Sequence, residues 1–433
     1  MIVELHGDYE SRSPVGPSDV GLHNYIYHLD TEPLFFWYNI GGAGYNCWRI
    51  WEDSAFLTRD WKNLSVPQDL DEAFHDPNVM FVAYNSSFER YMTDKLGWEI
   101  PVSRMIDPQA GGRYLSLPAS LEVQGEVLGL PPSLAKNKRG DELVKLFCQK
   151  VFVKATKKNP VAREYYNDWN SHPKEWAEFL EYGKQDVVAE GELLRRMRLL
   201  RAMPLPPLEQ KLWLFDQKVN DRGMPTDREF VRKMYALAVR AKKEAKENFE
   251  QITGVKNANS PAQIKAWAHP QGYPYPSLAK DIVTSALKDS NVKLSELCRT
   301  ALKMRAEAAS TSYQKLGKIL ETISPDGRLR GQFVYMGSSR CGRWSGNGFQ
   351  MHNLARPGVI TVCSSCKVMM KEKVCAACGA ETKSHDFEDQ KVVREARAMI
   401  YQEDYDGIKA KYGTVLLVVK NLIRTVFVAP EVA

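Results

Sequence analysis

The chain has 433 residues, enough for about three domains at the usual ~150 residues each. Apolar residues make up 44% and charged residues 26% of it, which is ordinary for globular proteins and excludes wholesale disorder, a collagen-like repeat and a coiled coil. No apolar run approaches the ~20 residues of a membrane-spanning helix, and the N-terminal residues do not resemble a secretory signal. We therefore expect no membrane and a cytoplasmic, reducing compartment.

The net charge of +6 is concentrated in one stretch of the chain. Ala301–Pro357 contains nine basic and three acidic residues, which accounts for the whole excess. A local excess of this kind suits a polyanion, because contacts to phosphates release counterions and so add affinity. A solvated basic surface explains it equally well.

Residues 1–205 alternate strand-like and helix-like segments, which predicts an α/β domain. The expected strands are Met1–Leu5, Phe35–Ile40 and Val79–Tyr84, and a helical pattern dominates Pro173–Met203. Three prolines mark Met203–Gln210 as a linker. Later helices are expected over the ranges Leu208–Asn220, Arg228–Gln251, Lys293–Glu321 and Lys391–Tyr401, and a helix followed by a strand is expected over Val415–Ala429.

Two carboxylates stand two residues apart after the opening strand, at Asp8 and Glu10. Strand side chains alternate, so both point to one side at the strand's C-terminal end, where α/β active sites tend to lie. Two oxygen ligands so placed suit Mg²⁺ or Mn²⁺. Alone, the pattern is weak, because chance supplies about one such triplet in a chain of this composition.

Two later motifs also carry acidic residues. Ser86 and Glu89, after the third strand, fit a capping box that starts a helix, and the residues alone favour this interpretation over a third carboxylate beside Asp8. Tyr182 and Asp186 are four residues apart in a helical run, so they share one face. Taken singly, that pair is better explained as an ordinary, partly exposed helix face.

In combination, D-x-E, N-x-x-F-[DE] and Y-x-x-x-D occur in the order found in DEDD-type 3′→5′ exonucleases with tyrosine. Residues 1–205 resemble the proofreading domain of family A DNA polymerases, especially phage-encoded ones. The resemblance implies a ribonuclease H-like fold and two-metal hydrolysis of the phosphodiester at a single-stranded 3′ end. The resemblance implies a role for each residue of the site. Two Mg²⁺ or Mn²⁺ ions would be bound by Asp8, Glu10, Glu89 and Asp186. Tyr182 would orient the attacking water, and Asn85 and Phe88 would contact the DNA. Glu89 departs from the aspartate common in relatives, but its longer side chain still reaches a metal.

Residues 206–357 resemble the mostly helical thumb and primer–template-binding region of the same family. The strongest match is Arg340–Pro357, RCGRWSGNGFQMHNLARP, although His352 stands where glutamine is commoner. By that match Arg343, Gln350 and Asn353 contact minor-groove acceptors, which every base pair presents. The further expected DNA contacts are Lys315, Lys318, Arg340 and Arg356. The alternative is a Gly- and Ser-rich surface loop.

A cysteine island at residues 358–386 interrupts that family pattern. Cys363, Cys366, Cys375 and Cys378 form C-x₂-C…C-x₂-C, the spacing of a zinc ribbon in which four thiolates hold one structural Zn²⁺. A pair of disulfides is the alternative, and the absence of a secretory signal disfavours it.

Residues 387–433 resemble the start of a polymerase palm, up to the run that leads into its first catalytic aspartate motif. The sequence therefore predicts a proofreading exonuclease and DNA-binding subunit of a split family A DNA polymerase, completed by a partner chain with the remaining palm and fingers. The apolar segments Val415–Val419 and Val426–Ala429 are expected to lie uncovered without that partner. A free-standing exonuclease with a duplex-binding platform, and a non-catalytic DNA-binding scaffold, are the alternatives.

Overall fold

The computed structural model describes residues 2–131, 139–155, 161–257, 260–289, 291–308, 313–369, 372–375 and 378–429. They form two compact units. The first contains residues up to Met224 together with Ser324–Met351, and the second contains Pro225–Ile323 and the residues from His352 onward. Within the described ranges, no helix combines the length and the apolar character needed to cross a membrane.

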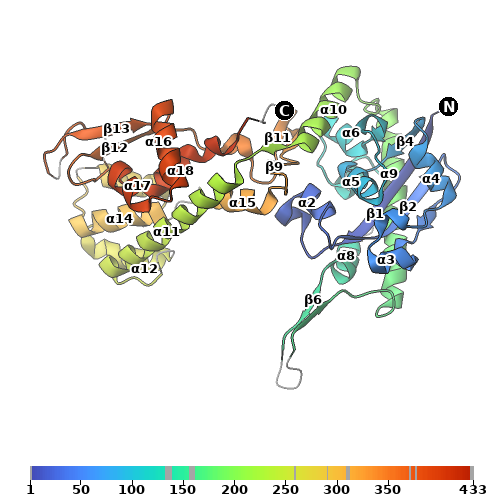
Figure 1. The fold of residues 1–433 in the computed structure, drawn as a ribbon, viewed down its shortest axis with the longest axis horizontal. Helices are drawn as coiled ribbons and strands as arrows, with labels where there is room; N and C mark the ends of the chain where they lie inside the picture. Colours follow the sequence, from blue (N-terminus) through green and yellow to red (C-terminus); the bar gives the residue numbers. More distant parts are fainter. Residues whose placement is uncertain are drawn as a thin grey trace. The chain divides into compact units, whose positions relative to one another are not determined.

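The first unit is built on a five-stranded mixed sheet. Its strands are β1 (Val3–Arg12), β2 (Glu32–Ile40), β3 (Asn46–Trp48), β4 (Val79–Val82) and β5 (Met105–Ile106), in the order β3-β2-β1-β4-β5. Figure 1 labels β1, β2 and β4 of this sheet. β1 pairs antiparallel with β2 and parallel with β4. β1 is thus the central strand. It runs to Arg12, so Asp8 and Glu10 lie within it rather than after it.

Apolar packing on both faces of β2 holds helices against the sheet. Phe35 meets the ring of Phe179 edge to face, with centroids 5.2 Å apart, and Phe179 belongs to α9 (Pro173–Leu199). The next residue, Phe36, lies 6.4 Å from Phe74 of α4 (Gln68–His75). Because successive strand residues point to opposite faces, α9 covers one face of the sheet and α4 the other.

The remaining elements of the first unit surround this sheet. The helix α10 begins at Pro207, so the proline-rich connection is shorter than the sequence predicted; proline is well tolerated in a first helical turn. The other elements are α1 (Pro17–Val20), α2 (Leu22–Ile26), α3 (Ser54–Thr58), α5 (Ser87–Leu96), α6 (Pro108–Tyr114), α7 (Leu121–Val127), α8 (Gly140–Cys148), β6 (Val151–Val153), β7 (Arg163–Tyr165), α10 (Pro207–Arg222), β9 (Arg328–Leu329), β10 (Phe333–Ser338) and β11 (Arg343–Gly346).

The second unit is mostly helical. The helix expected over Lys293–Glu321 appears as α14 and α15, and residues 309–312 lie outside the described residues. Its elements are α11 (Arg228–Thr253), α12 (Pro261–Ala268), α13 (Lys280–Lys288), α14 (Glu296–Ala308), α15 (Gln314–Thr322), β12 (Val359–Cys363), β13 (Thr382–Asp386), α16 (Gln390–Tyr401), α17 (Tyr405–Tyr412) and α18 (Val415–Leu422). The short strand β8 (Met224–Pro225) lies at the boundary between the units in the sequence.

The apolar segments near the C-terminus are packed, which corrects one expectation. Val418 and Val426 are fully buried, and α18 packs on the long helix α11. A 3₁₀ turn follows α18, and the expected strand is reduced to an isolated bridge between Thr226 and Phe427. The prediction of an uncovered apolar surface is therefore wrong for Val418 and Val426, which are packed inside the second unit, whereas Leu417 and Val428 are exposed.

Candidate carboxylate site and metal centre

The central strand β1 and the helix α9 place their acidic residues opposite one another. His6, Asp8 and Glu10 share one face of β1, and Tyr182, Asp186 and Glu190 share one face of α9. Two strand residues advance about 6.6 Å and four helix residues about 6.0 Å, so the two rows stay nearly in step. At one end the two rows are joined by an ion pair between His6 Nδ1 and Glu190 Oε1, which lie 3.3 Å apart.

Close approach of α9 to the sheet depends on a glycine. A Cβ at Gly183 would lie 2.8 Å from the Phe35 ring, too close for any larger residue without a shift of the helix. Tyr182 and Asp186, on either side of this contact, are both buried. The Y-G-x-x-D sequence therefore both presents the two side chains and lets the helix sit close enough to place them over β1.

The site concentrates negative charge in a buried space. Burial raises the pKa of Asp8 well above its ordinary value, and the charges of Glu89, Glu10 and Asp186 raise it further. Burial likewise raises the pKa of Tyr182, with additional repulsion from Glu10, Asp186 and Asp8. Each of these charge effects requires the groups to lie near one another. The five residues that the sequence singled out, Asp8, Glu10, Glu89, Tyr182 and Asp186, therefore lie in one cluster.

Glu89 enters this site from α5, and the capping box favoured by the local sequence does not form. Ser86 precedes α5 but makes no side-chain cap to it. Instead, Asp107 accepts hydrogen bonds from the backbone N–H groups of Asn85 (3.0 Å) and Ser86 (3.1 Å). Because another carboxylate satisfies the Ser86 N–H, Glu89 is not needed there. It lies 3% exposed within the cluster, where burial first and then the charges of Glu190 and Asp107 raise its pKa.

Two buried carboxylates that sequence reasoning missed support the corner between β4 and α5. Asp107 also accepts a hydrogen bond from the Ser86 hydroxyl at 3.2 Å. Glu190 accepts one from the Tyr84 N–H at 2.7 Å. Burial would lower the pKa of His6, but the neighbouring carboxylates of Glu190 and Glu4 outweigh that effect and raise it to about 9. Glu190 could have been found from the sequence, because it continues the four-residue spacing of Tyr182 and Asp186.

The residues of the carboxylate site fit divalent cations in two respects. Like charges crowded in a buried space favour either protonation or a bound cation, and Glu89 Oε2 is buried with no hydrogen-bond partner among the described residues. The carboxylates are nevertheless spread out: in the described ranges, the four cysteines are the one group of three or more candidate ligands whose atoms all lie within 4.8 Å. A pair of ions about 3.5–4 Å apart spreads its ligands more widely than one ion does.

The residues expected to contact DNA are divided between the two units. Asn85 is exposed and Phe88 half-buried beside the carboxylate site, where Asn85 has a φ of 64°. Arg340, Arg343 and Gln350 are exposed in the first unit, around the hairpin of β10 and β11. That hairpin is held by Trp344, whose indole N–H donates to Asp216 at 2.6 Å.

The other expected DNA contacts belong to the second unit. Asn353 and Arg356 are exposed there, and Lys315 and Lys318 lie half-buried on α15. The ammonium group of Lys315 donates to the Asn353 carbonyl at 2.9 Å, so the structure brings these two together. Lys318 lies 3.7 Å from Glu321 on the same helix.

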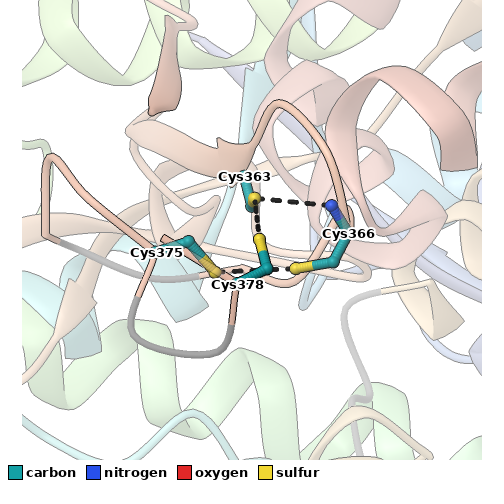
Figure 2. Close-up of side chains that lie close together, drawn as sticks. All are labelled: Cys363, Cys366, Cys375 and Cys378. Atoms are coloured by element: carbon teal, nitrogen blue, oxygen red, sulfur yellow. Dashed lines mark hydrogen bonds between the residues drawn. The ribbon is translucent and has the colours of Figure 1, made fainter. Parts of the chain in front are cut away.

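The four cysteines converge at the end of a two-stranded ribbon (Figure 2). Cys363 Sγ lies 3.4 Å from Cys378 Sγ, and Cys366 Sγ lies 3.5 Å from Cys375 Sγ. All four are free thiols, so the alternative of two disulfides is not what the structure contains. Four sulfur atoms within 4.8 Å of one another provide the ligand set of a structural zinc site with no open position.

Local backbone geometry favours ionisation of one of these thiols, Cys363. The N–H groups of Ser365 and Cys366 both donate to Cys363 Sγ at 3.4 Å. Burial opposes ionisation of Cys363, but these hydrogen bonds outweigh it and lower the pKa of the thiol to about 6. A backbone hydrogen bond also lowers the pKa of the Cys366 thiol, but its hydrogen bonds to Cys363 and Cys375 outweigh that effect and raise the pKa to about 12. β12 and β13 pair antiparallel beneath the cluster, and His385 of β13 packs edge to face on Tyr412 of α17. The ribbon is therefore fixed to the helices of its own unit.

Comparisons with known proteins connect the chain to DNA polymerases. No protein-family model matches the sequence. The chain is 28% identical over 425 residues to a DNA polymerase of Bacillus phage SP02, and the match covers 98% of this chain but 57% of that polymerase. The chain is thus a distant homologue of a phage DNA polymerase and spans a little over half of its length.

Among solved structures, the chain is similar to the POL domain of Pol1 from M. smegmatis in complex with DNA primer-template and dNTP. The two are 12% identical with a TM-score of 0.44, and the match covers 84% of this chain and 57% of that one. A TM-score of this size does not establish a shared fold.

Proposed function

We propose that the first unit is a 3′→5′ exonuclease that trims single-stranded DNA ends. The observation that carries this proposal is the convergence of Asp8, Glu10, Glu89 and Asp186, from three distant segments, in one partly buried cluster with Tyr182. The strand order β3-β2-β1-β4-β5 with antiparallel β2 supports a ribonuclease H-like domain. Homology to a phage DNA polymerase makes DNA the natural substrate.

The four carboxylates would hold two divalent cations, Mg²⁺ or Mn²⁺. Once bound, such ions lower the pKa of an attacking water and stabilise charge on the attacking and leaving oxygens. Burial and the neighbouring carboxylates raise the pKa of Tyr182, so its hydroxyl keeps its proton at neutral pH. That hydroxyl can therefore donate a hydrogen bond that orients the water. Asn85 and Phe88, next to Glu89 in the chain, would contact the terminal nucleotides.

The test is hydrolysis of a 5′-labelled single-stranded oligonucleotide with Mg²⁺, compared with the same reaction in EDTA. The wild-type protein should shorten the strand from its 3′ end, and Asp8→Ala should not. A wild-type protein without metal-dependent 3′ trimming would contradict the proposal and leave the DNA-binding scaffold as the better interpretation.

We further propose that the chain is part of a family A DNA polymerase and binds the primer–template duplex. The residues proposed to contact the duplex are Lys315, Lys318, Arg340, Arg343, Gln350, Asn353 and Arg356. DNA synthesis would then depend on the catalytic aspartates of the palm and on the fingers, supplied from outside the described residues, whether by the same polypeptide or by a partner chain. Primer extension should appear when the chain is combined with a palm that carries the catalytic aspartates and with the fingers. No extension with any such complement would favour the free-standing exonuclease.

A further inference from the structure

A two-stranded arm, formed by β6 and β7, leaves the first unit beside the carboxylate site. Figure 1 shows β6 extending away from the sheet. β6 and β7 pair antiparallel, with Val151 opposite Tyr165 and Val153 opposite Arg163. The two strands make no part of the central sheet.

Both ends of the arm are held against β1, the strand that carries Asp8 and Glu10. The helix α8, which ends at Cys148 just before the arm, packs against β1. On the returning side, Arg12 of β1 stacks 4.6 Å from the ring centroid of Tyr166. At its other end, α8 reaches the site as well, since a Cβ at Gly140 would lie 2.0 Å from the Tyr182 ring. The arm therefore starts at the edge of the carboxylate site.

The arm combines an aromatic ring with cations. Phe152 is the central residue of β6, and Lys150 and Lys154 lie just outside the two ends of the strand. All three side chains are exposed. Phe152 is 57% exposed, although an aromatic side chain normally gains by burial. The described part of the arm carries three cations and a single acidic residue, Glu164. Glu164 pairs opposite Phe152 and lies 3.2 Å from Lys150, so Lys154 and Arg163 are the cations without this acidic neighbour.

We propose that this arm binds single-stranded DNA and guides it toward the carboxylate site, an inference that rests on the proposed exonuclease function. Single-strand-binding surfaces combine cations along the backbone with aromatic rings on which unpaired bases stack. Lys150 and Lys154 stand two residues before and two residues after Phe152 in the chain, so cations and an exposed ring occur together on this arm. A duplex hides the faces of its bases in the stack, so the exposed ring favours a single strand over a duplex.

Equilibrium binding in EDTA tests the arm separately from catalysis. The probe is a fluorescein-labelled oligo-dT of about 16 nucleotides, read by fluorescence anisotropy with the whole chain. Phe152→Leu keeps apolar bulk but loses the stacking surface and should weaken binding about 5- to 100-fold, whereas Phe152→Tyr should bind like the wild type. Lys154→Gln should lower the slope of log affinity against log salt by about 0.7, and Lys211→Gln, an exposed lysine on α10, should not.

The outcomes separate the arm from the exonuclease. Unchanged affinity in Phe152→Leu together with an unchanged salt slope in Lys154→Gln would overturn the arm proposal, even if the wild type degrades DNA. Equal weakening of binding to a blunt duplex would also overturn it, in favour of a duplex contact. Arm-dependent binding by a protein that hydrolyses no DNA would support the arm and contradict the proposed exonuclease.

Discussion

The two groups of candidate metal ligands are assembled in opposite ways. The four cysteines come from 16 consecutive residues, and a two-stranded ribbon with local hydrogen bonds brings them together. The four carboxylates come from β1, α5 and α9, which are separated by dozens of residues. A short segment determines the first group, and the whole first unit determines the second.

Their electrostatics also differ. Backbone N–H groups lower the pKa of Cys363 and so favour the thiolate that binds metal. In the carboxylate site, burial and mutual repulsion raise the pKa of Asp8 and Glu89, so the ionised form is disfavoured without a cation. The cysteine ribbon can therefore depend on its metal for folding. The carboxylate site must instead be held together by the surrounding unit, and the repulsion among its carboxylates lowers the stability of that unit.

The largest effect is expected from breaking the cysteine cluster. Cys378→Ser should release about one zinc per chain and unfold the ribbon locally, because metal binding in such small sites contributes of order 10–16 kcal/mol that is coupled to folding. Elemental analysis and hydrogen exchange across residues 358–386 provide the measurement. Cys341→Ser, a change at an exposed cysteine outside the cluster, is the matched control. Freshly purified, reduced wild-type protein without zinc would refute the site.

Breaking the carboxylate site should affect activity and leave the fold intact. We expect Asp8→Ala or Asp186→Ala to reduce hydrolysis of single-stranded DNA about a hundred- to a thousandfold, because each removes a group that stabilises the transition state through the metal ions. Circular dichroism should be unchanged. Either variant degrading DNA at the wild-type rate would show that these residues are not the site.

A smaller effect should follow from loosening the support behind Glu89. Asp107 holds the backbone of Asn85 and Ser86, and Asp107→Asn replaces one accepting oxygen with an amide that donates. We expect about a 10- to 100-fold loss of activity or metal affinity, as for other residues that orient metal ligands. Raising the Mn²⁺ concentration should recover part of the loss. If Asp69→Asn, a change on α4, lowers activity equally, the effect is not specific to this corner.

The smallest effect is expected in how the free energy of unfolding depends on pH. Because the pKa of Asp8 is raised in the folded state, the unfolded chain loses this proton first as pH rises above about 4. Folding is then increasingly disfavoured, by up to about 1.4 kcal/mol per pH unit until the folded pKa is reached. In EDTA, Asp8→Asn should therefore gain stability relative to wild type between pH 4 and 7, measured by urea unfolding. A constant difference across this range would contradict the raised pKa, and Mg²⁺ should reduce the gain.

Much of the local structure was accessible from the sequence. The periodicity of Pro173–Met203 predicted α9 (Pro173–Leu199), and the apolar run Val79–Tyr84 predicted β4 (Val79–Val82). The cysteine spacing predicted a compact four-thiol cluster, which the structure contains. These features depend on neighbours in the chain, so composition and spacing are sufficient to find them.

Features that depend on distant residues could be settled only by the tertiary structure. The sequence favoured a helix cap for Ser86 and Glu89, but Asp107, about twenty residues later, takes the Ser86 N–H and leaves Glu89 in the cluster. The sequence also left Val418 and Val426 uncovered, whereas α11, nearly two hundred residues earlier, buries them. The sequence shows which groups are present and how far apart they lie along the chain. Burial, competition for hydrogen bonds and charge repulsion act through space, so the tertiary structure decides which of these groups meet.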